Sequence, residues 1–281
     1  MAFFVAINVI LSFVAVYAPL VSIILIIFLP LTSAVVEINC KDRWFPIYAL
    51  ATIGLSIVVS LSQIDFTLFY VVPSIISGYI FGLFQKKNLP DMFSIFFAAI
   101  FQTGFSLAFI PLFNLISGTN FVEIFAKILK ISDKNTFISW LACILFLMSL
   151  VQTILSFIVV KNELQKMGAK TDKKRDDYLF GIIAVIVSVI IAVFGIIFYV
   201  PIGYLFIAIS FFFSVFVCID EAKKKQTALL VIALISCLIG IFVYGIANKY
   251  IPDGKDLVLF DCVPFLIGIS GISYYFLKKS K

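Results

Sequence analysis

No charged side chain occurs in the chain before Glu37. An apolar run of this length is too long for one membrane-spanning helix, which needs about 20 residues to cross the hydrocarbon core of a bilayer. Pro19 lies near the middle of the run, and a proline removes a backbone donor and interrupts a helix. The sequence therefore predicts two transmembrane helices at the start of the chain, near 2–17 and 20–38.

Similar apolar runs continue along the rest of the chain, and charges and prolines separate them. They cover 45–62, 66–84, 92–117, 136–160, a double-length stretch 178–219 that breaks at Pro201, and finally 227–248 and 258–277. These runs predict an all-α, polytopic integral membrane protein with about ten transmembrane helices. A short or re-entrant segment in either double-length run would lower the number to eight or nine.

The composition supports a bilayer rather than water as the surroundings of this fold. Hydrophobic residues make up 63% of the chain and charged residues 13%, and its mean hydropathy is +1.19. A water-soluble domain is about half apolar, so this chain would have too little polar surface to cover its core. A transmembrane β-barrel shows short alternating segments, whereas these runs are continuous.

The basic residues predict the orientation, because cytoplasmic loops of membrane proteins are enriched in Lys and Arg. With the N-terminus inside, 16 of the 21 Lys and Arg residues fall in cytoplasmic segments, and the opposite orientation reverses this ratio. We therefore expect both termini in the cytoplasm and a multi-pass protein of a plasma membrane. The frequent Phe, Ile and Lys residues indicate a bacterium with an AT-rich genome.

The net charge of +6 does not predict a nucleic-acid partner, because no basic stretch is interleaved with exposed aromatic residues. The longest charged stretch, 161–177, predicts a cytoplasmic connector between a six-helix half, residues 1–160, and a four-helix half, residues 178–281. Its simplest interpretation is a solvated loop. The alternative is that Lys173, Lys174 and Arg175 dock a cytoplasmic partner or anionic lipid.

A second polar segment, 119–133, has the pattern of an amphipathic helix. Phe121, Phe125 and Ile128 recur at helical spacing, while Glu123 and Lys127 fall on other faces. This pattern predicts a helix that lies on the outer membrane surface, or one that caps a cavity opening outward.

The chain lacks the residues that several classes of chemistry require. The chain contains no His, and its five Cys residues form no CxxC pair, so we expect no metal site and no nucleophile–histidine pair. It has no GxxxxGK[ST] phosphate-binding loop. The carboxylates within predicted spans, Glu37 and Asp261, fall near the predicted helix ends. We therefore expect neither an enzyme nor a cofactor, and no proton-driven pump.

Uncharged polar residues inside the spans are the candidates for ligand binding. Gln102, Thr103 and Asn114 fall on the predicted helix 92–117, and Gln152 falls on 136–160. One hypothesis is a polar-lined pocket for a small solute. The alternative is that these side chains hydrogen-bond neighbouring helices, at about 0.5–2 kcal/mol per contact.

Small residues four apart predict places where two helix backbones approach closely. Gly78 and Gly82 form a GxxxG motif, and Ala2 and Ala6 form a similar small-xxx-small pattern. Packing within this chain is the simpler interpretation of both, and a partner interface is the alternative.

The stretch 13–90 carries a resemblance to a known family. It contains Val16-Tyr-Ala-Pro19, an apolar run that ends in Phe28-Leu-Pro-Leu31, and a helix Pro73-Ser-Ile-Ile-Ser-Gly-Tyr-Ile-Phe-Gly82 followed by Lys86-Lys87. These residues resemble the YybS-like bacterial membrane proteins. That family is in turn similar to the S components of energy-coupling factor (ECF) vitamin transporters.

The resemblance implies that the first half captures a small molecule from outside. In ECF systems a separate membrane coupling protein and two ATPases supply the energy, and a small-xxx-small pattern on the first helix contacts the coupling protein. Ala2 and Ala6 match that pattern. The four helices past residue 177 depart from the roughly six of an S component. The alternative function is a non-catalytic scaffold or accessory subunit of an envelope process, with 161–177 as its docking loop.

Overall fold

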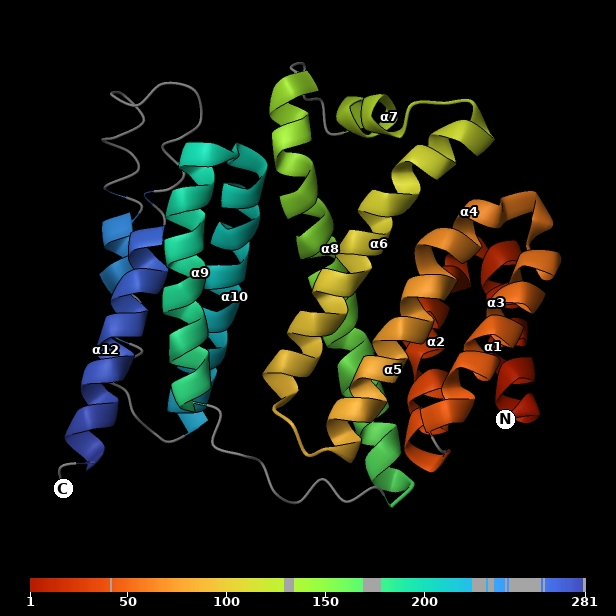
Figure 1. Cartoon of the computed structure of the whole chain (residues 1–281), viewed down its shortest axis with the longest axis horizontal. Helices are drawn as coiled ribbons and strands as arrows, with labels where there is room; N and C mark the ends of the chain where they lie inside the picture. The colour runs from red at the N-terminus through yellow and green to blue at the C-terminus, as the bar shows by residue number, and fades with distance from the viewer. Residues whose placement is uncertain are drawn as a thin grey trace. The chain divides into compact units, whose positions relative to one another are not determined.

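A computed structural model of the chain describes all residues except 41, 129–133, 169–177, 224–230, 232–234, 241, 243–258, 260 and 280–281. Helices make up all the regular secondary structure in the described part (Figure 1). This confirms the all-α prediction. The connector residues Lys173, Lys174 and Arg175, and most of the predicted helix 227–248, lie outside the described residues.

The helices follow one another with short connections. Their bounds are α1 Ala2–Tyr17, α2 Pro19–Asn39, the 3₁₀ turn η1 Asp42–Trp44, α3 Phe45–Val59, the 3₁₀ turn η2 Leu61–Gln63, α4 Ile64–Phe66, the π-helix η3 Thr67–Val71, α5 Val72–Lys86, α6 Asp91–Ser117, α7 Phe121–Ile128, α8 Lys134–Lys166, α9 Tyr178–Phe198, α10 Val200–Lys223 and α12 Cys262–Lys279.

Among the described helices, five are long and apolar enough to cross a membrane. They cover Ile64–Lys86, Asp91–Ser117, Trp140–Lys166, Leu179–Phe198 and Val200–Ile219. Shorter apolar helices cover Ala2–Tyr17, Ile24–Asn39, Phe45–Val59 and Cys262–Ile272. Large apolar side chains such as Leu115 and Phe198 are more than four-fifths exposed. These features are those of a membrane protein, whose outer surface contacts lipid tails.

Prolines separate the two double-length runs, as predicted. α1 ends at Tyr17 and α2 begins at Pro19, while α9 ends at Phe198 and α10 carries Pro201 in its first turn. A proline fits the first turn of a helix, where its missing N–H would have no intrahelical partner. The breaks predicted at these two prolines are confirmed.

α8 extends beyond the predicted helix 136–160 and ends at Lys166, so it includes the first residues of the predicted connector 161–177. Lys161 and Asp91 form an ion pair that joins this end of α8 to the first turn of α6. Lys166 Nζ lies 2.6 Å from Glu163 Oε1, three residues earlier on the same helix. Such pairs stabilise a helix that leaves the apolar region, and Gly168, in the left-handed conformation at φ +82°, follows its end.

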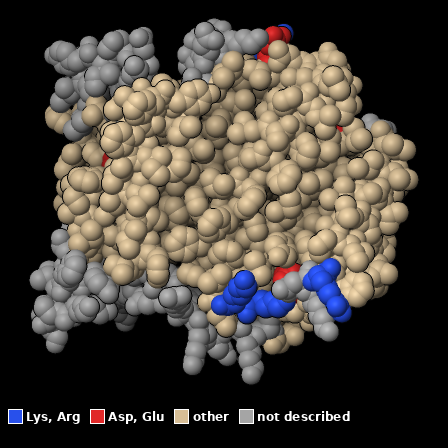
Figure 2. Space-filling view, in the orientation of Figure 1, with Lys and Arg blue, Asp and Glu red and all other residues tan. Residues whose placement is uncertain are grey.

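The chain forms two compact units, one of residues 1–128 and 145–175 and the other of 129–144 and 176–281. In the first unit α2 packs against α1 and α5, α1 also packs against α3, and α5 packs against α6 (Figure 1). Val5, Leu29, Val36, Tyr48 and Ile75 form the core at the meeting of α1, α2, α3 and α5. Over this unit, Figure 2 shows Lys and Arg gathered at one end, next to a largely uncharged surface.

In the second unit α9 and α10 pack as a helix pair, and α12 packs against α9. Glycines allow the pair to approach closely where it turns. A Cβ at Gly195 would lie 2.8 Å from the backbone nitrogen of Gly203. The segment 235–240 also contacts α12, because a Cβ at Gly240 would lie 2.5 Å from a methyl carbon of Val263.

Candidate functional site

The structure brings together two of the four predicted ligand-binding residues. Gln102 lies on the buried face of α6, with its side chain 5% exposed, and Gln152 lies half-buried on α8. The amide nitrogen Nε2 of Gln102 donates a hydrogen bond to Oε1 of Gln152 over 2.6 Å. This contact is a neutral, polar link between two apolar helices.

The amide pair has unused hydrogen-bonding capacity. A glutamine side chain offers two N–H donors and a carbonyl oxygen with two lone pairs. Within the described part of the chain, the one bond between Gln102 and Gln152 uses a single donor and a single acceptor site. The carbonyl of Gln102 and the amide nitrogen of Gln152 therefore have hydrogen-bonding capacity that this bond does not use.

The other two predicted residues make different contacts. Thr103 is buried beside Gln102, but its hydroxyl donates to the carbonyl of Ala99 one turn earlier, at 2.8 Å. Asn114 lies three turns further along α6, about 18 Å from Gln102 along the helix axis. Its Oδ1 accepts a hydrogen bond from the backbone N–H of Phe121 at 2.8 Å, so it fixes the start of α7.

α7 is anchored at the end of α6 by aromatic contacts. Phe121 stacks on Phe69 with ring centroids 6.0 Å apart and on Phe125 at 5.2 Å, and it meets Phe113 edge-on at 5.7 Å. Such pairs contribute about 0.5–1.5 kcal/mol each beyond the area they bury. They hold α7 against the end of the first unit.

A cavity of about 360 Å³ lies at the same end of the first unit. The residues that line it are Leu61, Ile64, Asp65, Leu68, Phe113, Ile116 and Ser117. Phe113 belongs both to this lining and to the aromatic contacts under α7. The lining is mostly apolar, and the exposed Asp65 supplies its one ionisable side chain. The cavity lies on the side of the unit that the sequence predicts to face outward.

A buried polar cluster between α1, α2 and α3 was missed by the site prediction. Nδ2 of Asn8 donates to Thr32 Oγ1 at 2.6 Å and to the Tyr48 hydroxyl at 3.2 Å. The Tyr48 hydroxyl also lies 2.9 Å from Thr32 Oγ1 and 3.3 Å from Ser33 Oγ. All four side chains are buried. They link three helices in an apolar core, where each hydrogen bond avoids an unsatisfied polar group.

The sequence signal for this cluster is a four-residue spacing along α3. Tyr48, Thr52, Ser56 and Ser60 all fall on one helix face, and all are buried. The Ser60 hydroxyl hydrogen-bonds Thr67, which begins the π-helix η3. This polar stripe therefore joins α3 to both α1 and the helix that follows, and its role is packing.

The GxxxG motif lies where α5 crosses α2. A Cβ at Gly78 would lie 2.2 Å from the carbonyl oxygen of Pro30, and one at Gly82 would lie 2.7 Å from Glu37 Cβ. By contrast, Ala2 and Ala6 are exposed on α1. The glycine pair thus sets the spacing of two helices of this chain, whereas the alanine pair lies on the exposed surface of α1.

Glu37 meets Lys86 at the end of this crossing. The Glu37 side chain is fully buried, and its Oε1 lies 3.6 Å from Lys86 Nζ. Lys86 Nζ also donates to the backbone carbonyl of Glu37 at 3.4 Å. The ion pair closes the α2–α5 contact at the last residue of α5.

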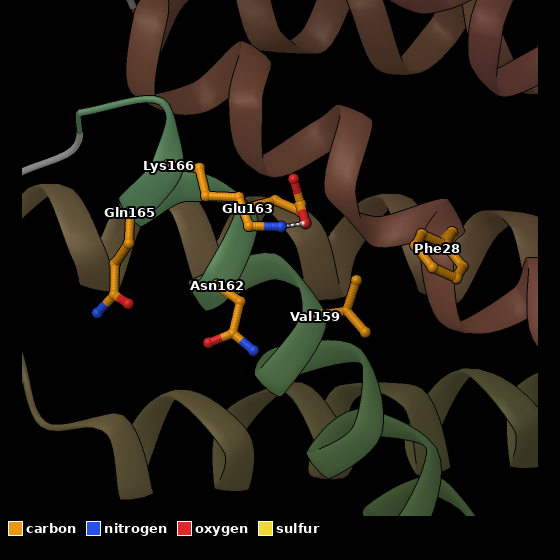
Figure 3. Close-up of a pocket in the computed structure, with 6 residues that line it drawn as sticks. All are labelled: Phe28, Val159, Asn162, Glu163, Gln165 and Lys166. Atoms are coloured by element: carbon orange, nitrogen blue, oxygen red, sulfur yellow. Dashed lines mark hydrogen bonds and ion pairs between the residues drawn. The ribbon is translucent and has the colours of Figure 1, made fainter.

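A groove of about 560 Å³ lies between α2 and the extended end of α8. Figure 3 shows Phe28 of α2 on one side and, on the other, Val159 with the ion pair of Glu163 and Lys166, while Asn162 and Gln165 point away from Phe28. Because Glu163 and Lys166 neutralise each other, the groove favours a neutral or mixed-charge occupant.

The described residues contain no group of three or more Cys, Asp or Glu side chains that could hold a metal ion. No protein-family model, curated protein or solved structure matches the chain.

Proposed function

We propose that the chain is a bacterial plasma-membrane protein with about ten spans and with both termini in the cytoplasm. The five long apolar helices and four shorter ones support this proposal. α1, with 16 residues, has a length of about 24 Å, and a bilayer adapts to a short span by local thinning. The surplus of basic residues in the predicted cytoplasmic segments supports the orientation.

We further propose that the first unit binds a small, uncharged polar solute from outside. The observation that carries this proposal is the hydrogen bond between the buried Gln102 of α6 and the half-buried Gln152 of α8. A solute with a hydroxyl, carbonyl or amide group replaces this one bond by bonds to both side chains. In an apolar interior such bonds discriminate strongly against analogues that lack the polar group, because the site's own amides would stay unpaired.

Other features of the first unit fit a capture role. The cavity beside Asp65 and the aromatic anchor of α7 lie at the end of the unit that the charge pattern predicts to face outward. Ala2 and Ala6 are exposed on α1, where a coupling membrane protein with separate ATPases could contact them. This is the arrangement that the resemblance to ECF S components implies.

A stability screen with small polar solutes tests the binding proposal. A solute that binds only the folded protein at a concentration 100 times its Kd stabilises it by about 2.7 kcal/mol. We expect at least one amino acid, nucleoside, sugar or vitamin to raise the Tm of the wild-type chain. The increase should vanish in the double variant Gln102→Leu/Gln152→Leu and persist in Gln63→Leu, which changes an exposed glutamine in the same unit.

The double variant suits this test because it removes both partners of one hydrogen bond. Replacing both groups by apolar side chains of similar size is close to neutral for stability. A solute that stabilises the double variant as strongly as wild type contradicts binding at this pair.

The second candidate function is a scaffold or accessory subunit. The observation that favours it is the groove formed by Phe28 and the extended end of α8, where Asn162, Glu163, Gln165 and Lys166 belong to the charged stretch 161–177. A partner protein would then co-purify in fixed proportion and dissociate when Lys173, Lys174 and Arg175 are neutralised. If Gln102→Leu/Gln152→Leu loses the stabilisation by solute but keeps that partner, solute binding and partner binding use different parts of the chain.

A further inference from the structure

Asp261 occupies an unusual position in the second unit. The sequence places it near the end of a span, whereas in the structure it directly precedes α12 and lies against the middle of α10. Its Oδ1 accepts a hydrogen bond from the Ser210 hydroxyl at 2.7 Å. Ser210 lies about 15 Å along α10 from its start at Val200, which is half the thickness of a hydrocarbon core.

The carboxyl group is buried with only one of its oxygens bonded. Asp261 is 2% exposed, and its Oδ2 makes no hydrogen bond to any described residue. The described residues that line the cavity beside it carry no cationic side chain. An isolated ionised carboxylate in such surroundings is far more costly to bury than a neutral acid.

The ionisable groups around Asp261 are few. α9 carries none between Leu179 and Phe198, and Asp220, Glu221 and Lys223 of α10 lie ten or more residues beyond Ser210. Tyr204 of α10 packs against Trp140, at 5.0 Å between ring centroids. Among the described residues that line the cavity beside Asp261, Cys262 carries the other titratable side chain.

Asp261 also borders an apolar cavity of about 370 Å³. The other residues that line it are Val189, Ile190, Val193, Phe194, Leu259, Cys262 and Phe265. Several of them, including Ile190, Phe194 and Phe265, are exposed on the surface that the proposed topology turns toward lipid. The carboxyl group is thus next to a space that an apolar molecule can enter.

We propose that Asp261, supported by the Ser210 hydroxyl, is a proton-binding site of the second unit that is reached through this apolar cavity. The proton resides on Oδ2, while Oδ1 accepts the Ser210 hydrogen bond. Carboxyl groups buried at the depth of a bilayer interior commonly mark proton pathways. The site is independent of the glutamine pair in the first unit.

An apolar carbodiimide tests this proposal, because it reacts with protonated carboxyl groups in apolar surroundings. The acid proton passes to a carbodiimide nitrogen as the carboxyl oxygen attacks the central carbon. The acyl group then migrates from oxygen to nitrogen and leaves a stable N-acylurea. The adduct contains all atoms of both reactants, so its mass identifies it.

The experiment treats the purified full-length chain with dicyclohexylcarbodiimide across a series of pH values and maps the adduct by peptide mass spectrometry. We expect one dominant adduct, on Asp261, whose yield falls as the pH rises. In Ser210→Ala we expect labelling to persist to higher pH, because the hydroxyl that stabilises the ionised form is gone. The adduct should be absent in Asp261→Asn.

Three outcomes overturn the proposal. They are labelling of exposed carboxyls such as Asp65 without labelling of Asp261, labelling of Asp261 that does not vary with pH, and protection of Asp261 by sodium ions at constant pH. The last outcome would identify a metal-cation site instead. Because the adduct is located by mass in the wild-type chain, the test does not depend on whether Asp261→Asn folds.

Discussion

The α-carbon of Gly82 lies against the side chain of Glu37 where α5 crosses α2. A Cβ built at Gly82 would lie 2.7 Å from Glu37 Cβ and 2.9 Å from the carbonyl oxygen of Ala34. One turn earlier, a Cβ at Gly78 would lie 2.6 Å from Ser33 Cβ. The two carbon–carbon distances, to Glu37 Cβ and to Ser33 Cβ, are shorter than non-bonded carbon atoms tolerate. Any larger residue at these glycines therefore pushes the two helices apart.

Gly82→Ile should therefore lower the folded yield and the stability of the protein. Overpacking of a close helix contact costs about 1–3 kcal/mol, which appears as a lower Tm in detergent. Gly104→Ile is the matched control, because a Cβ at Gly104 meets nothing within 4 Å. Equal melting of Gly82→Ile and wild type would show that the α2–α5 contact is looser than the structure describes.

The ion pair beside this crossing gives a second prediction. Lys86→Met removes the positive charge that lies 3.6 Å from the buried Glu37 carboxylate. We expect a loss of about 1–2 kcal/mol, below the 3–5 kcal/mol for a fully buried pair, because Lys86 is partly exposed. Lys87→Met alters the exposed neighbouring lysine and should leave the Tm unchanged. If both variants melt alike, the pair contributes nothing.

The polar cluster gives a third prediction. Tyr48→Phe removes the hydroxyl that contacts Asn8, Thr32 and Ser33. The buried polar groups that remain lose a partner, at a cost of about 1–3 kcal/mol. Tyr199→Phe changes an exposed hydroxyl and serves as control. Thermal unfolding of the two variants compares them directly, and equal Tm values would assign the cluster no structural role.

Cysteine accessibility in intact cells checks the proposed orientation. In a background without the native cysteines, Lys166→Cys should resist a membrane-impermeant thiol reagent, and Thr119→Cys should react with it. Both positions are exposed, at opposite ends of the first unit's long helices. Both should react after the membrane is opened, which controls for local access. The reverse pattern in closed cells would overturn the orientation.

Local sequence features predicted the helix breaks because their causes are local. Pro19 and Pro201 interrupt a helix whatever surrounds them. The end of α8 could not be predicted in this way, because Lys161 is held by Asp91, 70 residues earlier in the chain. The hydrogen bond between Ser210 and Asp261, which directly precedes α12, is likewise a long-range contact that no local pattern indicates.

In the candidate site, too, the sequence predicted what has a local cause and not what long-range contacts determine. Polar residues inside apolar runs mark positions of interest, and they identified Gln102 and Gln152 separately. Which of them meet depends on how α6 and α8 are rotated about their axes, and this is set by tertiary packing. Asn114 was grouped with Gln102 because both are polar on one helix, yet it caps α7. The four-residue spacing from Tyr48 to Ser60 was present in the sequence but indicates packing as readily as binding.

The most direct test of solute binding is native mass spectrometry of the detergent-purified chain. We predict a retained small molecule on the wild-type protein and on Gln63→Leu, and none on Gln102→Leu/Gln152→Leu. Retention of the same molecule by the double variant would contradict binding at the glutamine pair. A wild-type protein that carries no small molecule but a stoichiometric protein partner would contradict the solute-binding function and support the scaffold.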